Sequence, residues 1–187
     1  MKRKWMGVLA LMGLACLTPA WLQVAPNVWF NLKHRGYPTS EQLSKAFPGE
    51  SQRVFDDADE LTLLSLDAES NMNEDENNMK GKPGFFHGYR VLGQTKVSGW
   101  QKARLLRAFY SGMADKTFAA ACFSPHHGLR VSSNGKNVDL VVCFGCQQFV
   151  TYAPTGRGGS TISRAPRETF NSVLDRVGVP LDRAARG

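Results

Sequence analysis

The chain lacks the sequence patterns of several common ligand-binding classes. No run of lysine and arginine is interleaved with aromatic residues and no nucleic-acid-binding motif is present, so a nucleic-acid partner is not expected. The segment Gly156–Gly159, "GRGG", is not followed by the Lys-Ser or Lys-Thr pair of a phosphate-binding loop. The acidic segment 67–76 lacks the alternating acids and central glycine of an EF-hand calcium loop. Cysteine is also scarce: the chain has 4, and three of them lie within residues 122–146.

Apolar side chains and positive charge are, by contrast, plentiful. Hydrophobic residues make up 42% of the 187 positions and 11 residues are phenylalanine, which is ample for a packed core. The formal net charge is +7, but residues 50–76 carry ten acids and one base, whereas residues 77–187 carry sixteen bases and five acids. We interpret the basic half as a solvated surface balanced by the acidic half.

The N-terminus has the pattern of an export signal. Three basic residues at positions 2–4 precede an apolar run over residues 5–17. Three outcomes fit this pattern: retention of residues 1–22 as a membrane anchor, cleavage after Ala20, or lipidation at Cys16 to give a lipoprotein. Each outcome places the body of the chain outside the cytosol, in a bacterial periplasm or at the cell surface, with the membrane contacted through the N-terminal segment.

Turn residues and hydrophobic periodicity divide the chain into four segments. Residues 1–22 form the signal peptide or anchor helix, and residues 23–58 form a lead-in with a short helix. Residues 59–153 form an α+β core that contains the Cys/His hairpin, and residues 154–187 form a linker and a C-terminal helix.

Periodicity also predicts individual elements. The expected elements, in chain order, are a helix at Ser40–Phe47 capped by Thr39 and Gln42, strands at Glu60–Asp67 and Phe85–Val97, a helix after Ser98 with an apolar stripe from Trp100 to Met113, a strand at Lys116–Phe123, and a helix after Pro166. These elements predict an α+β fold: an antiparallel sheet of about five strands with helices mainly on one face, plus the N-terminal hydrophobic helix.

A tight hairpin is the most specific structural prediction. Asn134-Gly135 is typical of a two-residue type I′ turn, because both central residues of that turn need positive φ. A two-residue loop at this point pairs residues whose numbers sum to 269, so Arg130 faces Asp139 on one side of the sheet. On the other side aliphatic residues face each other, and a slip of one residue would ruin both sets. Continued past Gly128, the register places His127 opposite Val142 and His126 opposite Cys143.

Three cysteines, Cys122, Cys143 and Cys146, form the candidate site. Outside the cytosol, the first interpretation is a disulfide between Cys122 and either Cys143 or Cys146, which leaves one thiol. Buried thiols without special chemistry are a second interpretation. A zinc-type site with His127 as the fourth ligand is a third. The fourth is a redox-active CxxC, or Cys143 activated by His126, although in thioredoxin-like proteins CxxC starts a helix and here the following "QQFVTY" is typical of a strand.

The segments "FHGYRVLG", "CFSPHHGL" and "DLVVCFGC" resemble a group of uncharacterised bacterial exported or membrane-anchored proteins. That group carries a Cys-Phe-x-Pro-x-His-Gly segment, a hairpin, and an Asp-x-x-x-Cys-Phe-x-Cys segment, and the similarity covers roughly residues 60–152. The group often has Arg where His126 stands, which makes His127 the better ligand candidate. The resemblance implies a compartment and a motif, and no reaction.

From these features we expect a non-enzymatic module of the cell envelope that binds a partner protein or a small ligand. The cysteine cluster is then structural and no cofactor is needed. The alternative is a zinc-dependent or thiol-dependent activity centred on Cys122, His127, Cys143 and Cys146.

Overall fold

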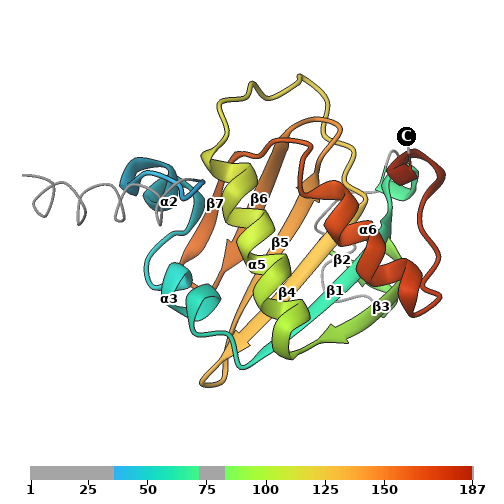
Figure 1. Cartoon of the computed structure of the whole chain (residues 1–187), viewed down its shortest axis with the longest axis horizontal. Helices are drawn as coiled ribbons and strands as arrows, with labels where there is room; N and C mark the ends of the chain where they lie inside the picture. The colour runs from blue at the N-terminus through green and yellow to red at the C-terminus, as the bar shows by residue number, and fades with distance from the viewer. Residues whose placement is uncertain (1–35, 72–82, 187) are drawn as a thin grey trace, which may run out of the picture. The chain divides into compact units, whose positions relative to one another are not determined.

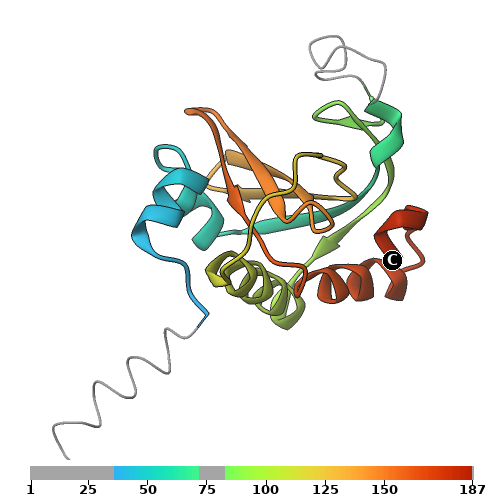
Figure 2. The same ribbon diagram turned by 90° about the horizontal axis from the view of Figure 1, so that it is seen from above.

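A seven-stranded antiparallel sheet forms the centre of the computed structural model, which describes residues 36–71 and 83–186 (Figure 1). The strand order is β2-β3-β1-β4-β5-β6-β7. The strands are β1 (Glu60–Asp67), β2 (Phe85–Phe86), β3 (Tyr89–Val97), β4 (His127–Ser133), β5 (Lys136–Cys143), β6 (Gln148–Ala153) and β7 (Gly156–Thr161). The α+β class is confirmed, but the sheet has seven strands and not about five. It curls into a half-barrel (Figure 2).

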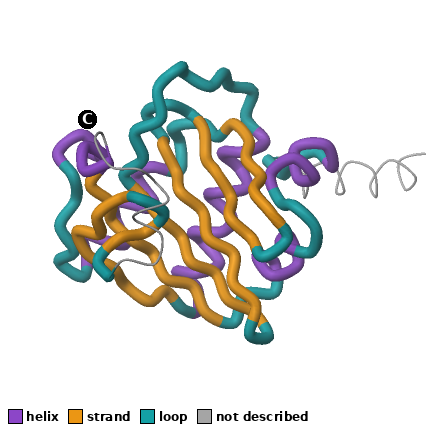
Figure 3. The backbone as a smooth tube through the Cα atoms, turned by 180° about the vertical axis from the view of Figure 1, so that it is seen from behind, coloured by secondary structure: helices purple, strands orange, loops and turns teal. Residues whose placement is uncertain are grey.

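Two helices lie across one face of this sheet. Figure 2 shows α5 (Gly99–Ala114) and α6 (Arg167–Arg176) on the same side, and Figure 3 shows the strands from the opposite side. Two shorter helices, α2 (Ser40–Ala46) and α3 (Ser51–Asp56), pack near β7 and near β4 and β5. The capping box expected at the start of α2 is present, because the Thr39 hydroxyl accepts from the Gln42 amide while the Gln42 side chain accepts from the Thr39 amide.

The predicted hairpin register is confirmed between β4 and β5. Arg130 pairs with Asp139, and His127 pairs with Val142. Pairing ends at His127, so the expected His126–Cys143 pair does not form. Asn134 has φ 49° and is followed by a glycine of φ 74°, as a type I′ turn requires.

The sheet has apolar clusters on both faces. The helix-covered face holds the main core, in which alternate strand residues pack against α5 and α6; its fully buried members include Phe55, Phe109, Phe144, Phe149, Phe170, Leu63 and Leu129. The opposite face holds a smaller cluster made of Leu64, Leu66, Phe86, Tyr89 and Val141. The alternation of strand residues therefore buries both faces at the centre of the sheet.

The segment Phe85–Val97 was expected to be one strand; the strand is confirmed over Tyr89–Val97, but the start of the segment folds back on it. It forms the hairpin β2–β3, with a turn at His87 (φ 49°) and Gly88 (φ 90°). Glycine adopts positive φ freely, whereas a histidine in this conformation is uncommon. The turn brings the His87 ring over the helix-free face, where it stacks on Tyr152 at 3.8 Å between ring centroids.

The segment from residue 154 to Pro166 was expected to be a linker, but it contains the edge strand β7. Two glycines allow this strand to fit. A Cβ at Gly158 would lie 2.5 Å from the Ala46 carbonyl oxygen, and one at Gly159 would lie 2.6 Å from the Phe149 carbonyl oxygen. The glycines that suggested flexibility instead permit close backbone packing.

Two further expectations between α5 and β4 are corrected. Trp100 was placed on the buried stripe of α5 but is 64% exposed, in the first turn of the helix. The segment Lys116–Phe123 forms no strand. It belongs to a long connection over residues 115–126, which we call the Cys122 loop. Its main chain is bound by Cys146 of the β5–β6 turn and by Gln148 at the start of β6, in place of a strand neighbour.

Residues 1–22 lie outside the described residues, so the signal or anchor stays a prediction. Within residues 36–71 and 83–186, no helix has the length and apolar character needed to cross a membrane.

Candidate functional site

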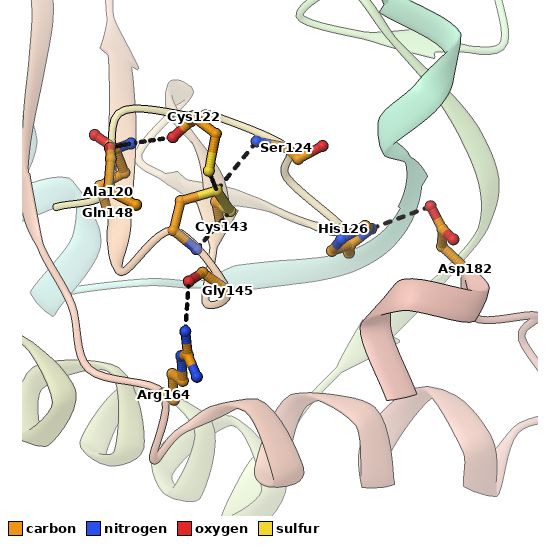
Figure 4. Close-up of a disulfide and its surroundings, with 10 residues drawn as sticks. Ala120, Cys122, Ser124, His126, Cys143, Gly145, Gln148, Arg164 and Asp182 are labelled. Carbon is orange, nitrogen blue, oxygen red and sulfur yellow. Dashed lines mark hydrogen bonds and ion pairs between the residues drawn. A yellow bond between two sulfur atoms is a disulfide. The ribbon is translucent and has the colours of Figure 1, made fainter. Parts of the chain in front are cut away.

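The three cysteines of the predicted cluster meet at one end of the sheet. Cys143 ends β5, Cys146 lies in the turn that leads to β6, and Cys122 lies in the Cys122 loop. Cys143 and Cys146 form a disulfide, with Cα atoms 5.2 Å apart. Cys122 has a free thiol whose Sγ lies 3.5 Å from the Sγ of Cys146 (Figure 4).

This pairing differs from the preferred interpretation of the sequence. We expected the disulfide to join Cys122 to Cys143 or Cys146, but the bond closes within the CxxC motif. Cys143 and Cys146 are an odd number of positions apart and would point apart in a straight strand. The strand ends at Cys143, and the turn that follows brings both sulfurs together.

Backbone amides surround the disulfide sulfurs. The Cys146 amide donates to the Cys143 Sγ at 3.0 Å, and the Ser124 amide donates to the Cys146 Sγ at 3.3 Å (Figure 4). Hydrogen bonds to a charged group favour its charged form. Each disulfide sulfur therefore has a donor in place to stabilise the thiolate that forms when the disulfide opens.

The Cys122 loop is tied to the β5–β6 turn and to the start of β6 by several hydrogen bonds. The Gln148 side chain donates to the carbonyl oxygens of Ala120 and Cys122, at 3.0 Å and 2.6 Å. The Ala120 amide donates to the Cys146 carbonyl at 2.9 Å. The Thr117 hydroxyl donates to the side chain of Gln147. These contacts hold the free thiol close to the disulfide.

Gln148 and Ser124 also belong to the site, although their residue types did not indicate this in the sequence. The Gln148 side chain binds main-chain oxygens, and Ser124 binds through its own main-chain amide. The position of Gln148, two residues after a cysteine, is visible in the sequence, but its partners come from a segment more than 20 residues away.

Solvent reaches the three sulfurs unequally. The residues Cys143 and Cys146 are 1% and 2% exposed, whereas Cys122 is exposed. A reagent from outside therefore meets the Cys122 thiol first. The two disulfide-bonded cysteines are almost inaccessible to solvent in the folded chain.

His127 does not join the cysteines. It is 1% exposed and lies on the helix-covered face, between the rings of Phe144 and Phe170. Its Nε2 donates to the Asn171 side-chain oxygen at 2.8 Å, and the side-chain nitrogen of Asn171 donates in turn to the Ala185 carbonyl. Cys143 points to the other face of the sheet, because its strand neighbour Val142 pairs with His127 and shares the helix-covered face.

The electrostatics of His127 agree with a buried neutral ring. Burial lowers the pKa of His127 to about 4, against the opposing effect of the Asn171 hydrogen bond. Among the described residues, no group of three or more His, Cys, Asp or Glu side chains is placed to hold a metal ion. The geometry therefore does not assemble the Cys3His arrangement that the sequence allowed.

His126 points away from the sulfurs. Its Nδ1 lies 3.1 Å from a carboxylate oxygen of Asp182 (Figure 4). Burial raises the pKa of Asp182, but hydrogen bonds from the Ala184 and Ala68 amides and the nearby His126 outweigh this effect and hold it below its ordinary value. His126 is engaged there and does not contact Cys143, so it is not placed to activate that thiol.

A second polar cluster lies on the helix-free face. Arg130 donates to both carboxylate oxygens of Asp139, at 2.9 Å and 2.7 Å, which confirms the predicted cross-strand pair. The His87 Nε2 lies 2.8 Å from the same carboxylate. Burial opposes the ionisation of Asp139, but the Arg130 and His87 hydrogen bonds prevail and hold its pKa below the ordinary value. His87 had no signal in the sequence, because its contact depends on the β2–β3 turn.

No protein-family model, curated protein or solved structure matches the chain, so its function is argued from the geometry of the site.

Proposed function

We propose that the chain takes part in thiol–disulfide exchange, with Cys122 as the outer thiol and the Cys143–Cys146 pair as the inner one. The observation that carries this proposal is the 3.5 Å distance between the free Cys122 Sγ and the Cys146 Sγ of the disulfide. Exchange begins when a thiolate attacks a disulfide sulfur, and these two sulfurs are already in contact. A cluster with a purely structural role would not need an exposed third thiol at this position.

The exchange is a two-electron transfer in three steps. In the reduced chain, the Cys122 thiolate attacks one sulfur of a partner disulfide and the partner's other sulfur leaves as a thiolate. The Cys146 thiolate then attacks the Cys122 sulfur, forms a Cys122–Cys146 disulfide and releases the partner. Finally the Cys143 thiolate attacks the Cys146 sulfur and displaces Cys122.

Atoms and electrons balance over the three steps. The partner disulfide becomes two thiols, while Cys143 and Cys146 become a disulfide and the Cys122 thiol is regenerated. The thiolates exchange their protons with water. The final state is the one in the structure, with Cys143 bonded to Cys146 and Cys122 free. The reverse sequence would reduce the chain at the expense of partner thiols.

The proposed location is outside the cytosol, as the basic and apolar residues 1–17 indicate. Disulfides persist in such compartments. The chain is then a thiol-dependent envelope module, and it needs no bound cofactor for the exchange.

Disulfide mapping of a Cys143→Ser variant tests the middle step. All proteins carry Cys16→Ser, which leaves only the three cysteines of the site. In a glutathione redox buffer, the Cys143→Ser chain is expected to form a Cys122–Cys146 disulfide, because those sulfurs are in contact. The chain with Cys143 intact is expected to retain Cys143–Cys146 and one alkylatable thiol at Cys122. Peptide mass mapping without reduction distinguishes these pairings.

A Cys122→Ser variant is the matched control for access. After reduction, its buried thiols are expected to react with the aromatic disulfide DTNB at least about tenfold more slowly than the thiols of the chain that retains Cys122. Equal rates, or two free thiols in the Cys143→Ser chain, would contradict the proposed exchange.

A further inference from the structure

The Cys122 loop presents an apolar surface to solvent. Phe118 is 89% exposed, and every residue from Phe118 to Cys122 is exposed. The intervening residues are all alanine. Figure 1 shows the loop extending beyond the end of the sheet between α5 and β4. Four residues span at most about 14 Å, so the phenyl ring and the thiol lie within reach of one short peptide.

The Cys122 loop is exposed although it is attached to the rest of the fold by hydrogen bonds. The main chain of Ala120 makes two hydrogen bonds, one to the Cys146 carbonyl and one from the Gln148 side chain. The loop is thus fastened on both sides of the exposed alanines, since Thr117 is bound to Gln147 of the β5–β6 turn and Cys122 to Gln148 at the start of β6. A fixed loop that holds a large apolar ring in solvent is typical of an interaction surface.

A groove adjoins this loop on the side of β7. It has a volume of about 560 Å³ and lies between α2, the start of β6, β7 and the loop. Ala119 forms part of its wall, and so does Gln148, the residue that binds the Cys122 carbonyl. The residues Gly159–Thr161 of β7 line the groove as well. The groove and the free thiol are therefore connected through Gln148.

The groove also meets a sheet edge. Among the described strands, β7 has one neighbour, β6, and stands at the end of the sheet order. An edge strand directs alternate N–H and C=O groups away from its neighbour, and an extended peptide can pair with them. The edge of β7 fits an extended main chain, and the Cys122 thiol fits a partner sulfur. The two features are independent, and an extended segment that carries a cysteine would use both.

We propose that the Cys122 loop and the groove beside β7 dock an extended polypeptide segment that carries a cysteine. The segment lies along Gly159–Thr161, the part of β7 that lines the groove beyond the contact of α2 with Gly158. It packs apolar side chains against Phe118 and presents its sulfur to Cys122. This inference rests on the proposed exchange function and names its partner class. The covalent step is the attack of the Cys122 thiolate on the partner's disulfide sulfur, with the partner's second sulfur leaving as a thiolate.

Activated peptides provide the test. The oxidised full chain with Cys16→Ser reacts with a short peptide of alternating valine and threonine around one cysteine, whose sulfur carries 5-thio-2-nitrobenzoate. Release of that thiolate gives the rate of mixed-disulfide formation. A second peptide has proline on both sides of the cysteine and so lacks the main-chain donors for pairing with β7. The extended peptide is expected to react about tenfold faster than the proline peptide.

Phe118→Ser is the loop variant, and Trp100→Ser is its matched control at another exposed aromatic residue. Phe118→Ser is expected to slow the extended peptide about tenfold. Trp100→Ser is expected to leave its rate unchanged. Both variants are expected to react with DTNB within about twofold of the unsubstituted chain, because Cys122 itself is intact.

Equal rates for the two peptides, or equal effects of Phe118→Ser and Trp100→Ser, would overturn the docking proposal. If Cys122 still reacts with DTNB in that case, the exchange function is not contradicted. Formation of a Cys122–Cys122 covalent dimer in place of the peptide adduct would also overturn it, because the occupant is then a second copy of the chain. If Cys122 does not react with DTNB, the exchange function itself is contradicted.

Discussion

At the scale of single residues, the surroundings of His127 set its charge. The Nε2 carries the hydrogen, because its partner atom on Asn171 is an acceptor. The Nδ1 has no hydrogen-bond partner within the part of the chain that the structure describes. Ser65, directly opposite on β1, has a buried hydroxyl that also lacks one. A charged ring at this place would lack both water and a counter-charge, so the folded state keeps His127 neutral.

This neutrality makes folding dependent on pH. The pKa of His127 is about 4 in the folded chain and about 6.5 for a histidine exposed to water in the unfolded chain, so between these values the unfolded state binds a proton that the folded state does not. Stability is therefore expected to fall as pH drops from about 6.5 towards 4. The loss from pH 7.5 to pH 4.5 is expected to be about 2–3 kcal/mol, and urea denaturation at the two pH values tests it.

The variant His127→Gln isolates this contribution. Glutamine does not titrate, so its free energy of unfolding is expected to change less between the two pH values. His126→Gln, a change at the neighbouring histidine beside Asp182, is expected to retain most of the loss. A His127→Gln chain that loses as much stability as the unsubstituted chain would show that another group is responsible.

At the scale of elements, β7 is defined by its glycines and by the end of α2. A side chain at Gly158 would meet the carbonyl oxygens of Ala46 and Lys45, at 2.5 Å and 2.8 Å from the Cβ position. Backbone atoms of a helix end move less readily than a flexible side chain. The absence of a Cβ therefore allows α2 to approach the edge strand and form one side of the groove.

Gly158→Ala is expected to lower the free energy of unfolding by about 1–3 kcal/mol, because the added methyl group cannot fit without displacing α2. Gly145→Ala is the matched control: nothing lies within 4 Å of its Cβ position, and its φ is not in the left-handed region. That change is expected to stay within about 0.5 kcal/mol. Urea denaturation without reductant measures both, and similar values for the two variants would refute the close approach of α2.

At the scale of the whole molecule, the disulfide is a local feature of a fold held by its core. The bond joins residues three positions apart, so it closes a very short loop. The restriction that such a loop places on the unfolded chain is worth about 2 kcal/mol. The main core spans β1, β4, β5 and β6 together with the helices, and neither Cys143 nor Cys146 is among its members. A reduced chain that stays folded is also what the exchange function requires.

Reduction is therefore expected to lower the melting temperature by about 4–8 °C without loss of a cooperative transition. Differential scanning calorimetry of the Cys16→Ser chain, with and without a phosphine reductant, measures this change. The Cys143→Ser, Cys146→Ser chain serves as the control, since reductant should not shift its transition through this disulfide. Disappearance of the cooperative transition on reduction would mean that the disulfide holds the fold together.

The features that were predicted correctly depend mostly on residues close together along the chain, and most of those that were missed depend on distant segments. Asn134 and Gly135 determined the register of β4 and β5, because a two-residue turn leaves the pairing of the flanking residues no freedom. The same local logic placed Thr39 at the start of α2. The apolar stripe of α5 was placed correctly from Phe109 to Met113, but Trp100 lies in solvent because helical spacing does not say where the neighbouring surface ends.

The candidate site was located from the sequence only in outline. The hairpin arithmetic and the spacing of the cysteines indicated that the three sulfurs gather at one end of the sheet, and they do. The choice of disulfide partners was wrong, because three sulfurs within contact distance have several possible pairings. Only the turn after β5 and the hydrogen bonds of Gln148 decide which pair is bonded and which thiol remains in solvent.

The sequence by itself determined the turn at Asn134-Gly135, the cap of α2, and the neighbourhood of the cysteines, because each depends on residues close along the chain or on the register of a single hairpin. Only the tertiary structure decided that β7 is an edge strand, that His127 lies on the opposite face from Cys143, and that Cys122 is the exposed thiol. These features depend on contacts between segments far apart in sequence, and neither periodicity nor residue type records which surfaces will meet.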